Sequence, residues 1–138
     1  MLCSCSHPTE FVHVKVLRGV DVCTKVFVRF VGTNCCTLSV DRYLSEMATV
    51  YADKKPFQVL YDATEVGRLP LYTIQKVAAF MRRFDDLTRL YLQKCAITIS
   101  SEWARAALTT LFIIKVPACP LKTFTTVGEA KTWLRAKD

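Results

Sequence analysis

The chain has 138 residues, 51% of them hydrophobic, which is enough to form one packed domain of ordinary size. Its formal net charge of +7 favours anionic partners in general, but the basic residues are dispersed and match no nucleic-acid-binding motif, so we predict no nucleic-acid partner. No apolar run reaches the roughly 20 residues that a membrane-spanning helix needs. We expect a mobile N-terminal tail over residues 1–9 and one domain over residues 10–138.

Two alternating segments at the start of the domain predict an antiparallel hairpin. Phe11–Leu17 places three valines on one face, and Thr24–Val31 alternates in the same way. The turn signal at Gly19–Asp21 joins the two segments. The valines are therefore expected to face the interior of the domain.

A helix is predicted next, between a capping serine and a basic stop. Ser39 can cap its first turn, and Lys54, Lys55 and Pro56 end it. Hydrophobic residues recur at helical spacing, which gives the helix one inward face. The residues of that face are Leu44, Met47, Ala48 and Tyr51.

The most informative stretch is the one from Pro56 to Phe84. Residues 57–61 form a short continuous apolar run, which is typical of a strand buried on both faces of a sheet. A polar turn follows at Asp62–Arg68, and Pro70 can then serve as the first residue of a helix. The inward face of this helix holds Ile74, Val77, Ala78 and Met81. Because ligands and partners of open α/β sheets meet the carboxyl ends of the strands, the turn is the first candidate for a site.

The second half of the chain predicts two more strands and two more helices. Asp85–Asp86 forms a polar break before a buried strand at Cys95–Ile99, and Ser100 or Ser101 caps the helix that follows. Its inward residues are expected to be Trp103, Ala107, Leu108, Leu111 and Phe112. A short strand at Leu121–Phe124 precedes a last helix, in which Thr126 and Glu129 form a capping box.

The predicted order of elements is β-β-α-β-α-β-α-β-α. Right-handed crossovers then place four helices over a mixed, mostly parallel sheet of about five strands. The expected fold class is α/β, as a single domain of two or three layers.

Three stretches of the sequence resemble a STAS domain. They are PFQVLYDATEV at residues 56–66, AITISSEWARAAL at residues 96–108 and PLKTFTTVGEAKTWL at residues 120–134. The ending is similar to the SpoIIAA-like branch, that of bacterial anti-anti-sigma factors, through Phe124, Ala130, Trp133 and Leu134. The resemblance implies a regulatory or ligand-sensing module that acts through its surface, without chemistry or a cofactor of its own. The chain is also distantly similar in shape to the lipid-binding lobe of CRAL-TRIO proteins.

One feature of the bacterial switch proteins is missing. Their helix after the central strand begins with an Asp-Ser pair whose serine receives a phosphate, whereas this chain reads Pro70, Leu71, Tyr72 and Thr73 there. We therefore do not expect a phosphoswitch of that type. Asp62 is expected to stabilise its turn, although a strand-end carboxylate could also act as a base or a metal ligand. The predicted partner-binding or ligand-binding residues are Asp62, Thr64, Glu65, Arg68, Tyr72 and Thr73.

Two functions from different classes compete. The preferred hypothesis is a non-enzymatic module that binds a partner protein through the turn after the central strand and the following helix. The alternative is a small hydrophobic-ligand or lipid carrier with a groove near Phe80, Met81, Trp103 and Phe112. A hydrolase or transferase built on Asp62 is the weakest hypothesis, because no nucleophile and base can be paired from spacing.

Seven cysteines, an odd number, match no disulfide framework and predict a reducing, cytoplasmic location. Cys3 and Cys5 could carry two acyl chains, which would attach the protein to a membrane peripherally. The same pair with His7 supplies three ligands, one short of a structural zinc site, so we predict no metal. The sequence leaves monomer and homodimer open.

Overall fold

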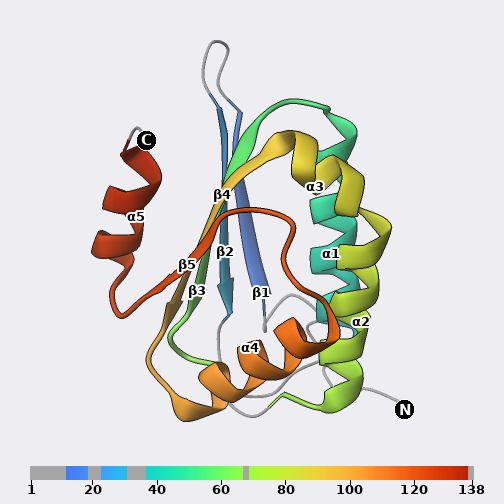
Figure 1. Cartoon of the computed structure of the whole chain (residues 1–138), viewed down its shortest axis with the longest axis vertical. Helices are drawn as coiled ribbons and strands as arrows, with labels where there is room; N and C mark the ends of the chain where they lie inside the picture. The colour runs from blue at the N-terminus through green and yellow to red at the C-terminus, as the bar shows by residue number, and fades with distance from the viewer. Residues whose placement is uncertain (1–11, 19–22, 31–36, 67–68, 137–138) are drawn as a thin grey trace.

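The fold is built around a five-stranded sheet. A computed structural model describes residues 12–18, 23–30, 37–66 and 69–136 (Figure 1). The strands lie in the order β1-β2-β3-β4-β5. They are β1 (Val12–Leu17), β2 (Thr24–Phe30), β3 (Phe57–Ala63), β4 (Leu92–Ile99) and β5 (Leu121–Phe124). β1 and β2 pair antiparallel, as the predicted hairpin requires, and every later pairing is parallel. The expected mixed, mostly parallel sheet is confirmed.

The helices cover the two faces of the sheet unequally (Figure 1). The described residues form α1 (Thr37–Ala52), α2 (Leu71–Arg83), α3 (Asp85–Tyr91), α4 (Glu102–Ile114) and α5 (Val127–Arg135). From β2 onward, each connection advances one strand in the same direction, so right-handed crossovers put α1, α2 and α4 on the same face. The short helix α3 packs against α1 and α2. Only α5 lies on the opposite face among the described helices.

β3 is buried on both faces, as its continuous apolar run predicts. Phe57 and Val59 have no exposed surface and belong to the large cluster under α1–α4. Leu60 is 3% exposed and belongs to a smaller cluster under α5. The strand therefore holds the two layers of helices together through alternate side chains.

The cluster under α5 is small and tied by polar contacts. It contains Leu60, Ala96, Ala130 and Leu134. The Gln58 side-chain amide donates to the Leu134 carbonyl at 3.0 Å, and the Lys94 ammonium donates to the carbonyls of Trp133 and Ala136 at 3.0 and 2.8 Å. Because the last carbonyls of a helix lack partners within it, Lys94 caps the end of α5.

The predicted break at Asp85–Asp86 is wrong, because these residues begin α3. Carboxylates are favoured in the first turn of a helix by the helix dipole, and one turn later Arg89 Nε donates to Asp85 Oδ2 at 2.9 Å. The protein thus has a helix that the predicted order lacks, while the α/β class and the order of strands hold.

Two of the predicted helix starts differ in detail, and a third is confirmed. Ser39 lies inside α1, which begins at Thr37, and its side chain is buried, so Ser39 is not the cap. Pro70 is the N-cap of α2 and not its first helical residue. Of the two serines proposed for α4, Ser101 is the cap, accepting a hydrogen bond from the Ala104 amide at 3.1 Å.

The predicted start of α5 is confirmed at Thr126. Its hydroxyl accepts from the Glu129 amide at 3.2 Å and lies 3.0 Å from Glu129 Oε1. The Glu129 side chain therefore returns to the Thr126 hydroxyl, where the standard capping box uses the Thr126 amide.

Candidate functional site

The turn after β3 is ordered by Asp62. Its Oδ1 atom accepts from the Thr64 amide at 3.2 Å and from the Thr64 hydroxyl at 2.7 Å. This is the turn-stabilising role predicted for Asp62. The Thr64 amide and hydroxyl thus both bind the same carboxylate oxygen.

A basic side chain from the neighbouring strand lies beside this turn. Arg29 of β2 is the register partner of Asp62, which places its guanidinium at the same end of the sheet. Arg29 Nη2 lies 3.0 Å from Glu65 Oε2, and Arg29 Nε lies 3.9 Å from Asp62 Oδ2. Exposed ion pairs of this kind contribute only about 0–1 kcal/mol to stability. The charges are thus available for recognition at little structural cost.

The turn after β4 is fastened to the turn after β3. Ser100 Oγ donates to the Thr64 carbonyl at 2.9 Å, and Ser101 Oγ donates to the Val66 carbonyl at 3.1 Å. Both turns lie at the carboxyl ends of adjacent parallel strands, the position at which open α/β sheets bind their ligands. The two turns therefore form one continuous surface.

Large apolar side chains are exposed where α2 and α4 begin. Leu71 and Trp103 are each 55% exposed, and Tyr72 is 38% exposed. The prediction that Trp103 faces inward is wrong. The buried residue in the first turn of α4 is its neighbour Ala104, which is 3% exposed. We call the set Arg29, Asp62, Thr64, Glu65, Leu71, Tyr72 and Trp103 the turn surface.

The predicted site residues do not all lie on this surface. Asp62, Thr64 and Glu65 are together, and Tyr72 is exposed at the start of α2. Thr73 is 4% exposed and lines an apolar pocket. Arg68 and the possible acylation sites Cys3 and Cys5 lie outside the described residues.

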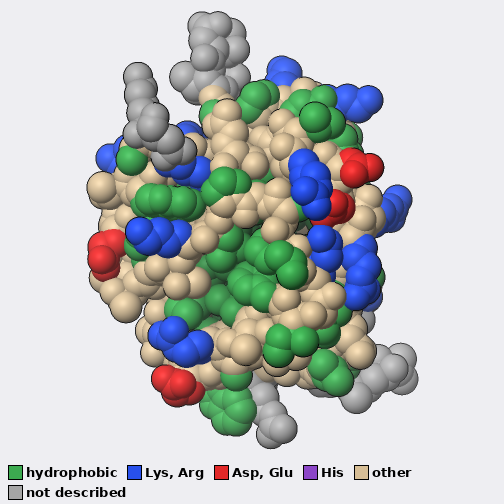
Figure 2. All heavy atoms as spheres, in the orientation of Figure 1, with side chains coloured by type: hydrophobic (Ala, Val, Ile, Leu, Met, Phe, Trp, Pro, Cys, Tyr) green, Lys and Arg blue, Asp and Glu red, His purple; other side chains and the backbone are tan. Residues whose placement is uncertain are grey.

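An apolar pocket of about 200 Å³ lies between the sheet and helices α1, α2 and α4. Figure 2 shows it as a hollow in which hydrophobic side chains gather near the middle of the face. Phe80, Met81 and Phe112 line the pocket, as the carrier hypothesis expected, but Trp103 does not. Apolar side chains at helical spacing therefore both build the core and surround a space within it.

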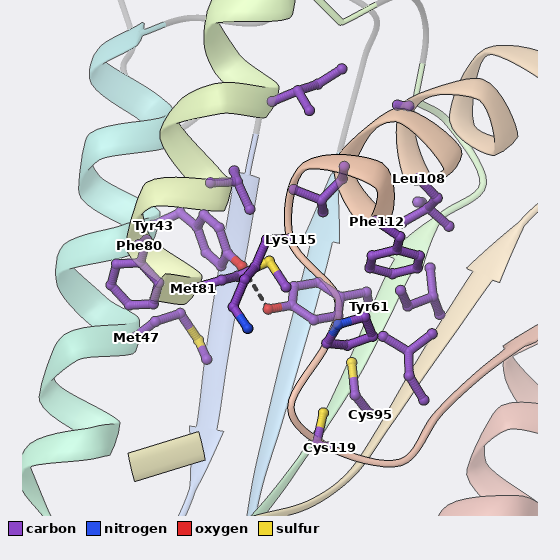
Figure 3. Close-up of a pocket in the computed structure, with 18 of the residues that line it drawn as sticks. Tyr43, Met47, Tyr61, Phe80, Met81, Cys95, Leu108, Phe112, Lys115 and Cys119 are labelled. Atoms are coloured by element: carbon purple, nitrogen blue, oxygen red, sulfur yellow. Dashed lines mark hydrogen bonds between the residues drawn. The ribbon is translucent and has the colours of Figure 1, made fainter. Parts of the chain in front are cut away.

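Two tyrosine hydroxyls meet in this pocket. Tyr43 of α1 and Tyr61 of β3 both line it, and their hydroxyl oxygens are 2.6 Å apart (Figure 3). Burial is the main cause that raises the pKa of each hydroxyl above its ordinary value. Phe30 stacks on Tyr61 with ring centroids 6.2 Å apart, which fixes the orientation of that ring.

A neutralised ion pair also lines the pocket. Lys115 Nζ lies 2.7 Å from Asp85 Oδ1 and donates to the Val116 carbonyl at 2.9 Å. The hydrogen bonds from Lys115 and then from Arg89 lower the pKa of Asp85. The charge of Lys115 is thus already balanced within the protein.

Comparisons with known proteins place this geometry in a fold family. No protein-family model matches the chain, and no curated protein matches it in sequence. A solved structure from Shewanella loihica PV-4, an uncharacterized DUF3478-family protein with a SpoIIAA-like fold, is similar with a TM-score of 0.64. It is 17% identical, over 89% of this chain and 93% of its own. This chain has a SpoIIAA-like fold.

A second structure with this fold is an anti-sigma factor antagonist from Mycobacterium paratuberculosis. It is 16% identical over 91% of this chain and 95% of its own, with a TM-score of 0.58. The predicted resemblance to the SpoIIAA-like branch of STAS domains is thereby confirmed at the level of the fold. At these identities the likeness shows the fold alone.

The turn surface contains three residues that sequence reasoning did not select for this SpoIIAA-like domain. Arg29 could have been found by aligning the predicted strands, because its register partner is Asp62. Trp103 was assigned to the core from its helical spacing, and Leu71 was read only as part of a helix start. Their exposure depends on how α2 and α4 are rotated, which the spacing alone does not determine.

Within residues 12–18, 23–30, 37–66 and 69–136, no three His, Cys, Asp or Glu side chains are grouped so that they could hold a metal ion. In the same ranges no helix is both long and apolar enough to cross a bilayer. Burial raises the pKa of Cys95, and that of Cys119 to about 11, so both thiols stay protonated at neutral pH.

Proposed function

We propose that this protein is a non-enzymatic regulatory module that binds a partner protein through the turn surface. The observation that carries the proposal is the exposure of Leu71, Tyr72 and Trp103 beside the charged cluster of Arg29 and Glu65. Protein interfaces combine aromatic anchors with a polar rim in this manner. Scattered single apolar residues are common on any surface, but these flank two turns that are fastened together.

The arrangement of Asp62 supports a binding role over a catalytic one. Its Oδ1 atom accepts two hydrogen bonds from Thr64, and its Oδ2 atom faces Arg29 at 3.9 Å. A general base needs a lone pair directed at a substrate. In this protein the carboxylate is used to hold the turn and to orient Arg29.

The anti-sigma factor antagonist with the same fold supports a regulatory role. Its name states that it acts against another protein, and it shares with this chain the fold that places two turns at the carboxyl ends of central strands. We extend the role of regulatory binding to this chain, with the turn surface as the contact.

The proposal is tested by affinity capture with the full chain as bait, from the cells that produce it. Two variants alter the surface without touching the core: Glu65→Lys reverses a charge, and Trp103→Ser removes an exposed aromatic. We expect a specific partner to bind each variant about tenfold or more weakly, as for anchor residues of known interfaces.

The matched control is Leu90→Ser. Leu90 is 71% exposed, so its replacement also alters only the surface. It lies on α3, which leads into the amino end of β4, whereas the turn surface lies at the carboxyl end. This variant should retain the partner in full. If the partner bound both surface variants as well as the unaltered chain, or was lost only with Leu90→Ser, the turn surface would not be the contact.

A further inference from the structure

Two hydroxyl pairs, Tyr51–Thr88 and Tyr43–Tyr61, differ in how their protons are used. The Tyr51 hydroxyl is 2.7 Å from Thr88 Oγ1, which donates in turn to the Phe84 carbonyl at 2.8 Å. Since a carbonyl only accepts, the Thr88 proton goes to Phe84 and the Tyr51 proton goes to Thr88. In this series of hydrogen bonds, the proton of each hydroxyl has an acceptor.

In the Tyr43–Tyr61 pair, one of the two hydroxyl protons has no acceptor among the described residues. Each hydroxyl has one proton, and a bond between two hydroxyls uses only one of them. Among the described residues, neither hydroxyl makes another hydrogen bond. Burial keeps both groups protonated at neutral pH, as their raised pKa values indicate. Whichever tyrosine donates within the pair, the other retains an O–H group in the pocket.

The size of the pocket limits what could use this donor. A cavity of roughly 150 Å³ lined by apolar side chains is known to bind benzene. The pocket here measures about 200 Å³ and is lined mainly by aliphatic and aromatic residues. It fits a single ring with a small substituent, and it is too small to enclose a whole two-chain lipid.

The charges at the pocket favour a neutral ligand. Lys115 and Asp85 line it, but they are paired at 2.7 Å, and Arg89 lies 2.9 Å from the other carboxylate oxygen. An anionic ligand would have to compete with Asp85 for Lys115. A charged group that is already paired also loses stabilisation when one partner is displaced in a partly buried site.

We propose that the pocket binds a small neutral molecule, the size of a substituted benzene, that has one hydrogen-bond acceptor, and that the Tyr43–Tyr61 pair donates its remaining proton to that acceptor. The O–H group would donate a hydrogen bond to a carbonyl or ether oxygen of the ligand, and the apolar walls would pack against the rest of the molecule. This proposal and the proposed function rest on different observations, so either can be wrong without affecting the other.

The test compares two probes of nearly the same shape, acetophenone and α-methylstyrene. They differ in that a carbonyl oxygen replaces a methylene group, so only acetophenone can accept a hydrogen bond. Dissociation constants are measured with the full chain by NMR titration, and nuclear Overhauser contacts to Met81 and Leu108 locate the probe. We expect acetophenone to bind about three- to tenfold more tightly, the net value of one neutral hydrogen bond.

Tyrosine variants separate the donor from the shape of the pocket. Tyr43→Phe and Tyr61→Phe each leave one hydroxyl, so both should keep the preference for acetophenone. The double variant has no hydroxyl, and its two dissociation constants should agree within about twofold. Removing both partners of a buried hydrogen bond is close to neutral for folding, so this variant is expected to stay folded.

Four results with the first two probes would overturn the proposal. They are the absence of binding by either probe, equal affinities in the unaltered chain, a preference that survives in the double variant, and contacts outside the pocket. Benzoate is the third probe and addresses the charge. Tighter binding of benzoate than of acetophenone would show that Lys115, and not the tyrosine pair, selects the ligand.

Discussion

The helices on the two faces of the sheet are packed in different ways. On one face, α1–α4 cover a large cluster that surrounds a pocket of about 200 Å³. On the other face, α5 packs two buried residues of its own, Ala130 and Leu134, against Leu60 and Ala96 of the sheet, and its end is held by Gln58 and Lys94. A large apolar face can keep an internal space and remain stable, whereas a small one depends on close fit and on polar ties.

The largest expected effect is on β3, which serves both faces. Phe57→Ala should lower the free energy of unfolding by about 3–5 kcal/mol, because Phe57 has no exposed surface and its removal adds a cavity. Denaturant unfolding followed by circular dichroism measures the change. Leu90→Ala, at a residue that is 71% exposed, is the control and should stay within about 0.5 kcal/mol.

The polar tie of α5 is the next test. Lys94→Met keeps the length of the side chain but removes the donor to the Trp133 and Ala136 carbonyls, so α5 should open about 2 kcal/mol more easily. Amide hydrogen exchange in α5 measures this local opening. In Lys122→Met, at an exposed residue of β5, exchange in α5 should be unchanged. Equal protection in Lys94→Met and the unaltered chain would contradict the role given to Lys94.

Enlarging one side chain on each face tests the difference in packing directly. Ala96→Val adds volume under α5, where Ala96 has no exposed surface, and should cost about 1–3 kcal/mol. Ala107 lines the pocket, so a larger side chain there has space to occupy. Ala107→Leu should therefore be neutral or stabilising by about 1 kcal/mol, as cavity-filling changes often are. Paired thermal and denaturant unfolding gives both values. If both variants lost equal stability, the two faces would be packed alike.

The smallest effect concerns the ion pair beside the pocket. The pKa of Asp85 is lowered in the folded protein, so its stabilising contribution is present above the ordinary value of 3.8 and is lost as the pH falls through the folded value. Asp85→Asn should therefore flatten the decline in melting temperature below about pH 4. Asp86→Asn, at an exposed neighbour, should keep the original slope. If melting temperature fell with pH at the same rate in all three proteins, Asp85 would not be the cause of the acid sensitivity.

The sequence predicts the parts of the fold that depend on local pattern. The apolar run of β3 requires burial on both faces, and Thr126 with Glu129 marks the start of α5. Asp85–Asp86 was read as a break because paired carboxylates are typical of both loops and helix starts. Only the contact with Arg89 one turn later distinguishes the two.

The candidate sites were less accessible to sequence reasoning. Asp62 and Glu65 could be selected because they follow a buried strand, but Arg29 joins them through strand register. The sequence suggested a groove near Phe80, Met81 and Phe112 but could not establish it, because these side chains have the same helical spacing whether they fill a core or surround a space. The meeting of Tyr43 with Tyr61 depends on how α1 lies across the sheet.

The turn after β3 has two sides with different neighbours. Ala63 and Val66 are buried and line the pocket, while Glu65, which lies between them in the chain, is exposed and paired with Arg29. A molecule in the pocket and a protein on the turn surface would thus touch the same few peptide units from opposite directions. Whatever free energy links the two occupants must be the same in both directions, so a compound that tightens the protein contact would itself be held more tightly by the complex.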